Sequence, residues 1–170
     1  IATMTSTVEG PFGSQLVVNG YFLNNELTDF TFAPEKDGAP VANRVQPGKR
    51  PLSSMSPTIV YGPDGKPVFA LGAAGGKTII MQVAKALIAK LDWGLDAKDA
   101  IAAPGMYFAG DAIQLEANTP LATMAGALAQ KGHTVIATDM PRLKANAVEL
   151  TIDGWRGAAG RCWRSITTRT

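Results

Sequence analysis

Apolar and small polar side chains alternate along the first 25 residues, and the dipeptide Gly10-Pro11 interrupts the alternation. A period of two is typical of half-buried strands, and a Gly-Pro break is typical of a turn. We therefore expect two strands separated by a turn at residues 10–11. Residues 31–56 follow with four prolines and mixed charge, which predicts a long loop, and long loops in compact domains are often functional.

The segment from residue 57 to residue 91 combines a strand pattern with a helix pattern. PTIVYGPDGKPVFALGA predicts a hairpin that turns at Asp64-Gly65. Gly76 then opens a predicted helix whose apolar stripe packs on the sheet. The stripe is expected to consist of Ile80, Val83, Leu87 and Leu91.

Helix and strand patterns alternate again from residue 96 onward. Asp96 is expected to cap a short helix that ends before Pro104. Residues 112–117 resemble a strand, and Thr119-Pro120 predicts a helix start. That helix should bury Leu121, Met124 and Leu128 and end at Gly132. Two further strands are expected at residues 134–138 and 147–152, the second ending at Asp153-Gly154. With no internal repeat and no dividing linker, the pattern predicts one layered α/β domain.

Composition narrows the class of protein. At 170 residues and 46% apolar side chains, the chain can bury the core of one domain, and no apolar run is long enough to span a membrane. The single cysteine, Cys162, excludes a disulfide framework within the chain and a cysteine metal cluster. His133, the only histidine, follows the predicted helix end at Gly132, and we expect it in a surface loop.

The net charge of +2 comes from the last residues of the chain. Residues 160–170, GRCWRSITTRT, contain three arginines and no acid, and without them 13 basic residues face 14 acidic ones. A nearly neutral body gives no support for nucleic-acid binding.

The stretch PVFALGAAGGKTII has the strand, glycine turn and helix of a phosphate-binding loop. A P-loop requires G-x-x-x-x-G-K-[ST]. Counted back from Gly76-Lys77-Thr78, the first glycine should stand at Leu71, but it stands at Gly72, so the loop is one residue short. A weaker expectation survives, which is an anion site on the backbone N–H groups of the glycine pair. Its ligand could be a phosphate, a carboxylate or a transition-state oxyanion.

Three polar groups could carry chemistry. Each also has an ordinary structural explanation: a solvated strand face for the first, a solvated turn for the second, and the end of a loop for the third. The groups are Thr5, Thr7 and Glu9; Glu26 and Asp29 beside Asn24 and Asn25; and Ser53 and Ser54 between two prolines. Acids can hold an ammonium group, and rigid serines can donate to a carboxylate.

Taken in order, TSTVEGPFGS, FLNNELTDF, PGKRPLSSMSPTI and LGAAGGKTII resemble the small subunit of γ-glutamyltranspeptidases, which are N-terminal nucleophile hydrolases. The resemblance covers about residues 1–159 and leaves residues 160–170 as an atypical basic tail, which a change of reading frame would explain. It implies an α+β fold, half of a four-layer αββα sandwich that the large subunit completes.

The resemblance also implies roles for single residues. Gly75 and Gly76 match the oxyanion hole, and Thr7 matches a threonine that hydrogen-bonds the nucleophile. Glu26 and Asp29 match the residues that bind the substrate α-amino group, and Ser53 and Ser54 match those that hold its α-carboxylate. Two positions depart from the pattern. Glu9 stands where well-known members have Asn, which would add a third acid near the amino pocket, and Ala74 replaces a Pro before the glycine pair.

The activity that the resemblance implies is γ-glutamyl transfer or hydrolysis of glutathione and related amides, without a metal or organic cofactor. The nucleophile would be a threonine upstream of Ile1, freed by self-cleavage of a precursor, and an arginine of the large subunit would pair with the α-carboxylate. We therefore expect a truncated small subunit, inactive alone, from a periplasmic or secreted enzyme. A cephalosporin acylase acting on a glutaryl group, and a non-catalytic fragment that binds amino acids, are the alternatives.

Overall fold

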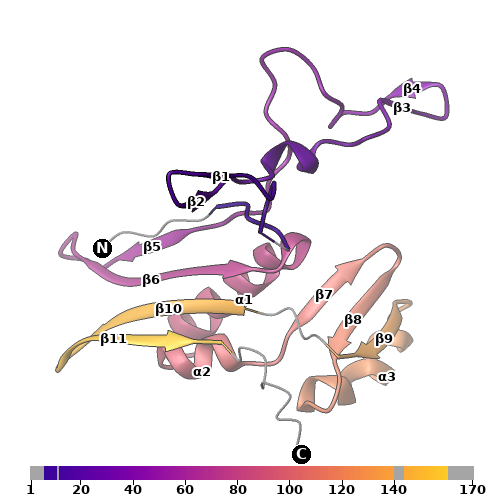
Figure 1. The fold of residues 1–170 in the computed structure, drawn as a ribbon. Helices are drawn as coiled ribbons and strands as arrows, with labels where there is room; N and C mark the ends of the chain where they lie inside the picture. Colours follow the sequence, from indigo (N-terminus) through magenta and orange to yellow (C-terminus); the bar gives the residue numbers. More distant parts are fainter. Residues whose placement is uncertain (1–5, 11, 140–143, 161–170) are drawn as a thin grey trace, which may run out of the picture. The chain divides into compact units, whose positions relative to one another are not determined.

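The computed structural model describes residues 6–10, 12–139 and 144–160 (Figure 1). The chain forms two compact units, a smaller one over residues 4–53 and a larger one over residues 54–170 with residues 1–3. Thr5 and the tail at 161–170 lie outside the described residues.

The smaller unit is built from two short hairpins and a single turn of 3-10 helix. Strands β1 (Val17–Val18) and β2 (Tyr21–Phe22) pair around Asn19-Gly20, both of which have positive φ, as a tight hairpin turn requires. The 3-10 helix η1 (Glu26–Asp29) follows. Strands β3 (Glu35–Lys36) and β4 (Ala39–Pro40) then pair around Asp37-Gly38.

Two predictions for this unit need correction. Gly10 lies in a turn, as predicted, but residues 6–9 form no strand, and the hairpin lies later, at residues 17–22. The alternation there reflects a chain held by side-chain and loop hydrogen bonds rather than by a strand partner. The predicted long loop at 31–56 is confirmed apart from the β3–β4 hairpin. The hairpins follow local turn chemistry, which an Asn-Gly and an Asp-Gly pair supply.

The larger unit contains a four-stranded antiparallel sheet in the order β11-β10-β6-β5. The strands are β5 (Thr58–Tyr61), β6 (Pro67–Ala74), β10 (Lys144–Thr151) and β11 (Gly154–Ala159). The predicted hairpin at Asp64-Gly65 is confirmed, and the Asp64 side chain accepts from the backbone N–H of Lys66 at 3.1 Å. The last strand, β11, was not predicted. It pairs with β10 after a turn at Ile152-Asp153, so the chain continues the sheet where we expected it to end.

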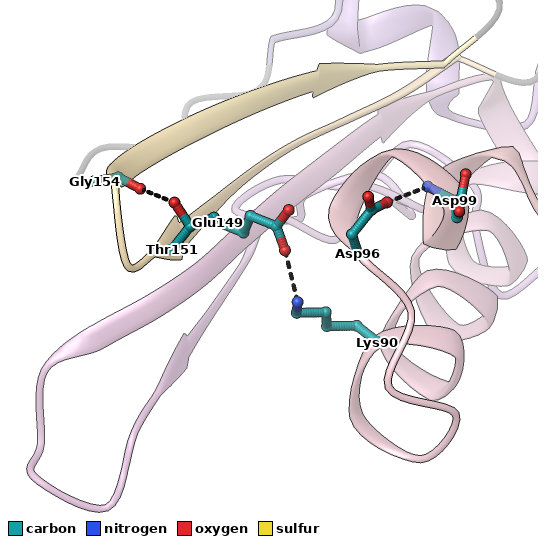
Figure 2. A network of polar contacts seen from close by, with 6 residues as sticks. All are labelled: Lys90, Asp96, Asp99, Glu149, Thr151 and Gly154. Carbon is teal, nitrogen blue, oxygen red and sulfur yellow. Dashed lines mark hydrogen bonds and ion pairs between the residues drawn. The ribbon is translucent and has the colours of Figure 1, made fainter.

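Helices α1 (Ile79–Leu91) and α2 (Ala97–Ala102) pack on this sheet, and a 3-10 turn, η2 (Gly76–Thr78), leads into α1. Asp96 caps α2 as predicted and accepts from Asp99 N at 2.8 Å (Figure 2). The core between helices and sheet is made by alternate residues of β6 and β10 and by one face of each helix. Its members are Phe69, Leu71, Ile79, Val83, Ala86, Ala97, Ile101, Ala145 and Ala147.

The α1 stripe is shifted from the prediction. Ile80 and Leu91 are 53% and 57% exposed, while Ile79 and Gln82 are 7% and 3% exposed. Of the predicted stripe, Val83 is buried and Leu87 packs on the core. The face of α1 that packs against β6 and β10 therefore includes Ile79 and Val83 rather than Ile80.

A second sheet of three strands follows, with β7 (Met106–Ala109) antiparallel to β8 (Ala112–Glu116) and β9 (Thr134–Thr138) parallel to it. The predicted strands at 112–117 and 134–138 are confirmed, and β7 was missed. Between β8 and β9 the chain forms a 3-10 helix, η3 (Pro120–Met124), and α3 (Ala125–Gln130), which ends before Gly132 as predicted. None of the predicted apolar stripe of this helix is fully buried: Leu121 and Leu128 are half-buried, and Met124 is exposed. His133 is exposed, as expected.

One charged pair is set into the four-stranded sheet and its helix. Glu149 of β10 is 3% exposed, and its carboxylate lies 2.6 Å from the Lys90 ammonium of α1 (Figure 2). The same ammonium lies 5.9 Å from the centre of the Phe69 ring. Burying an unpaired carboxylate lowers the stability of the folded state, so β10 can carry an acid on its buried face only because Lys90 pairs with it. In the described part of the chain, no helix is long and apolar enough to cross a membrane.

Candidate functional site

One of the predicted acids, Glu26, contacts a threonine hydroxyl in the smaller unit. Thr7 Oγ1 donates a hydrogen bond to a carboxylate oxygen of Glu26. The backbone supports the pair, because Asn25 N donates to Thr7 O at 3.1 Å and Glu9 N donates to the Asn25 side chain at 2.9 Å. Thr7 and Glu26 therefore meet because Asn25 joins their two segments.

The turn that presents the acids is held by its own asparagines. Asn24 Oδ1 accepts from the Glu26 backbone N–H at 3.0 Å, and Asn25 Nδ2 donates to the Thr28 hydroxyl at 3.1 Å. Asparagine side chains stabilise turns by bonding to backbone groups just ahead. The result is a short 3-10 helix with Glu26 at its start and Asp29 at its end.

Electrostatics at this turn favour a positively charged ligand. Burial raises the pKa of Asp29 above its usual 3.8, and the negative charges of Glu9 and Glu26 raise it further. Glu9, which replaces the usual Asn, therefore acts on Asp29 through its charge. A cation that entered beside these carboxylates would relieve their mutual repulsion. An ammonium group is such a cation, and it could also donate hydrogen bonds to them.

Asn43 is a site residue that the sequence reasoning missed. Its side-chain N–H donates to Asp29 O at 2.7 Å, and its side-chain oxygen accepts from Leu52 N at 2.9 Å. Its backbone oxygen also accepts from Thr31 N at 3.0 Å. Asn43 thus joins the acidic turn to the residue just before Ser53. The sequence could have indicated Asn43 only as an asparagine in a proline-rich loop. Its hydrogen-bond partners, Asp29 and Leu52, lie too far along the chain for local sequence patterns to identify them.

The two predicted serines belong to different units. Ser53 ends the smaller unit and is exposed, whereas Ser54 begins the larger unit and is half-buried. Ser54 O accepts from the Ser56 hydroxyl at 3.0 Å, which stabilises the bend that leads into β5. The predicted roles of both serines remain predictions.

The predicted glycine pair lies where β6 ends and the helical segment begins. Gly75 has φ 139° and Gly76 has φ 58°, values that residues with a Cβ rarely adopt. The peptide groups here can therefore turn their N–H groups in directions that a regular strand or helix does not allow. Such N–H groups at a helix start can receive an oxyanion. The structure thus groups Thr7, Glu9, Glu26 and Asp29 in one unit and Gly75 and Gly76 in the other.

Comparison with known proteins places these features in a family. The family model described as gamma-glutamyltranspeptidase matches residues 1–164. The glutathione hydrolase proenzyme of Bacillus subtilis (strain 168) is 43% identical over 109 residues, which are 63% of this chain and 18% of the relative. The acylase ACY 1 proenzyme of Pseudomonas sp. (strain SE83) is 30% identical over 170 residues, 99% of this chain and 29% of the relative. The chain therefore spans less than a third of the length of either relative.

Solved structures agree with the sequence match. The γ-glutamyltranspeptidase from Pseudomonas nitroreducens complexed with L-DON is 30% identical and has a TM-score of 0.74, covering 98% of this chain and 92% of its own. The mixed helices and sheets described above thus form the α+β fold of the N-terminal nucleophile hydrolases, as predicted. On the match over residues 1–164, this chain belongs to the γ-glutamyltranspeptidase family.

Proposed function

We propose that the intact protein containing this chain transfers the γ-glutamyl group of glutathione or a related amide to water, an amino acid or a peptide. The observation that carries the proposal is the hydrogen bond from Thr7 to Glu26 in the same turn as Asp29, whose pKa is raised by burial and by the charges of Glu9 and Glu26. An α-ammonium group is the part of a γ-glutamyl substrate that this group of charges suits.

In the proposed reaction, the hydroxyl oxygen of an N-terminal threonine upstream of residue 1 attacks the γ-carbonyl carbon. Its own α-amino group takes the hydroxyl proton, and the backbone N–H groups of Gly75 and Gly76 donate to the oxyanion that forms. The C–N bond then breaks, and the leaving amine receives the proton. Water or an acceptor amine attacks the resulting ester and frees the threonine for another cycle.

The other proposed groups bind rather than react. Glu26, Asp29 and Glu9 hold the α-ammonium group, and Ser53 and Ser54 donate to the α-carboxylate. Thr7 donates to the nucleophile when it is not paired with Glu26. The proposal includes a large subunit cut from the same precursor, with the arginine that completes the carboxylate site, and a periplasmic or secreted location. The proenzyme names of the relatives support the precursor.

A direct test compares two anilides with the intact, processed protein. The γ-glutamyl anilide carries the α-ammonium and α-carboxylate groups, whereas the glutaryl anilide lacks the ammonium group. We expect hydrolysis of the γ-glutamyl compound with the higher kcat/KM. Loss of that preference in a Glu26→Gln variant would attribute it to the acidic turn. A protein that hydrolyses neither anilide would overturn the proposal.

Glutaryl acylase activity is the second candidate, because the Pseudomonas acylase aligns with almost the whole chain. The negative charges of the acidic turn argue against a glutaryl substrate. A glutaryl group brings no cation to Asp29, Glu26 and Glu9, so these carboxylates would lose solvent without gaining a partner. A higher kcat/KM for the glutaryl anilide would reverse this order of preference.

A further inference from the structure

The side chain of Gln82, on the first turns of α1, is buried and makes three hydrogen bonds. It is 3% exposed. Its Nε2 donates to Ala74 O at 3.0 Å and to Thr78 Oγ1 at 3.1 Å, and its Oε1 accepts from Lys144 N at 2.8 Å. A buried glutamine amide must be satisfied to be tolerated, and here it links the end of β6 to the start of β10.

Thr78 continues this chain of hydrogen bonds to the next carbonyl. While its hydroxyl oxygen accepts from Gln82, its hydroxyl hydrogen donates to Gly75 O at 2.9 Å. The Thr78 backbone N–H points to the same carbonyl at a longer 3.3 Å. Two successive carbonyls, those of Ala74 and Gly75, are therefore held by two neighbouring side chains.

These two carbonyls belong to the peptide groups whose N–H groups matter for the proposed reaction. The Ala74 carbonyl shares a peptide plane with Gly75 N–H, and the Gly75 carbonyl shares one with Gly76 N–H. In a trans peptide the C=O and N–H bonds point in opposite directions. Holding each carbonyl therefore fixes the direction of the N–H on its other side.

Rotation of these planes is otherwise easy. Glycine has no Cβ to restrict φ and ψ, and both Gly75 and Gly76 have positive φ. An alanine, Ala74, stands where the family pattern has the more rigid proline. The network supplies through side chains the restraint that the backbone here lacks.

We propose that Gln82 and Thr78 are positioning residues that orient the two oxyanion-binding N–H groups of Gly75 and Gly76. The inference rests on the proposed function, because it assumes that an oxyanion forms at this pair. It adds that two side chains of α1 and its lead-in control the chemical step through the peptide groups that they hold. Preorganised donors stabilise a transition state because they need not reorient during the reaction.

The test uses the intact, processed enzyme with two substitutions that remove the bonds while keeping the shape. Thr78→Val removes the hydroxyl, and Gln82→Met removes the amide. We expect each to lower kcat for a γ-glutamyl anilide about tenfold, less than the roughly 10²–10³-fold that loss of a whole oxyanion donor costs. L-glutamate binds without forming an oxyanion, so its binding does not depend on the direction of these N–H groups. Its Ki as an inhibitor should therefore change by no more than about twofold, far less than the tenfold that about 1.4 kcal/mol of lost binding would cause.

Controls separate orientation from general damage. Thr78→Ser keeps the hydroxyl and should retain most of the kcat that Thr78→Val loses. Gln130→Met makes the same change on the exposed end of α3 and should leave kcat unaltered. If Gln82→Met fails to fold, Thr78→Val and Thr78→Ser decide the question.

The outcomes are distinct. Unchanged kcat in folded Thr78→Val would overturn the inference, and so would a Ki for L-glutamate that rises in step with the fall in kcat. In both cases an active wild type would leave the proposed function standing. A wild type with no γ-glutamyl activity would instead overturn the proposed function, and this inference with it.

Discussion

Thr7 donates its hydroxyl hydrogen bond to the carboxylate of Glu26, a residue 19 positions further along the chain. The two segments meet because Asn25 bonds to the backbone of both Thr7 and Glu9. In the proposed reaction, this hydroxyl lies between the nucleophile and an acid that holds the substrate ammonium group. We therefore expect its orientation to depend on whether a substrate ammonium group occupies Glu26.

Replacing Glu26 by Gln should weaken ammonium binding without breaking the contact with Thr7. The amide oxygen can still accept from the hydroxyl, but the charge is lost. Because hydrogen bonds to charged groups contribute about 1.5–3 kcal/mol, we expect Ki for L-glutamate to rise at least about tenfold. Inhibition by glutarate, which has no ammonium group, should not weaken. Glu35→Gln, on the exposed β3–β4 hairpin, is the matched control, and an equal effect there would contradict the assignment.

The pH dependence of ligand binding should report the raised pKa of Asp29. Asp29 is neutral below that pKa and ionised above it, so affinity for an ammonium ligand should increase as pH rises from 3.8 through the raised value. Folding stability has the opposite sign: the contribution of Asp29 is greatest below pH 3.8 and declines as pH rises through the same interval.

Glu9→Gln removes one of the charges that raise the pKa of Asp29, so the binding profile should move to lower pH. The measurement is the Ki for L-glutamate against pH in the wild type and in Glu9→Gln. The ratio of the two Ki values at each pH cancels the titration of L-glutamate itself. Superimposable profiles would show that Glu9 does not act on Asp29.

Substitutions in the glycine pair should differ in cost. Gly75, at φ 139°, occupies a region that is essentially closed to other residues, and Gly75→Ala should destabilise the protein by about 1–3 kcal/mol. Gly76, at φ 58°, has open space around a built Cβ, so Gly76→Ala should cost about 1–2 kcal/mol for conformation alone. Gly76→Asn should cost less than Gly76→Ala, because asparagine tolerates this region. Urea denaturation of the three variants gives the order, and an Asn variant less stable than the Ala variant would contradict it.

The Lys90–Glu149 pair should stabilise the larger unit far more than a surface pair does. Lys90→Met leaves the buried Glu149 carboxylate without its partner and should cost about 3 kcal/mol, the low end for a broken buried pair, since the Lys90 side chain is 27% exposed. Lys66→Met breaks a pair with Asp64 whose side chains are 77% and 57% exposed, and should cost under about 1 kcal/mol. Urea denaturation of both variants tests the contrast, and equal costs would contradict the burial argument.

Features governed by neighbouring residues were predictable from the sequence. The hairpin at Asp64-Gly65, the cap of α2 by Asp96 and the helix end at Gly132 all depend on residues within one turn of each other. The hairpins at Asn19-Gly20 and Asp37-Gly38 carry the same kind of signal, but we predicted a turn at Gly10-Pro11 and a loop over residues 31–56 instead. The ordered motifs also sufficed to indicate the family.

Tertiary structure decided everything that depends on distant partners. The buried face of α1 includes Ile79 and Gln82 rather than Ile80, because the helix meets β6 and β10 at a rotation that no local pattern encodes. Gln82 reaches Lys144 across 62 positions, and Thr7 reaches Glu26 across 19. A side chain's hydrogen-bond partners are set by which segments the packed core brings together. The sequence by itself therefore determined the locally coded turns, caps and helices and the family, whereas the fold determined which polar groups meet.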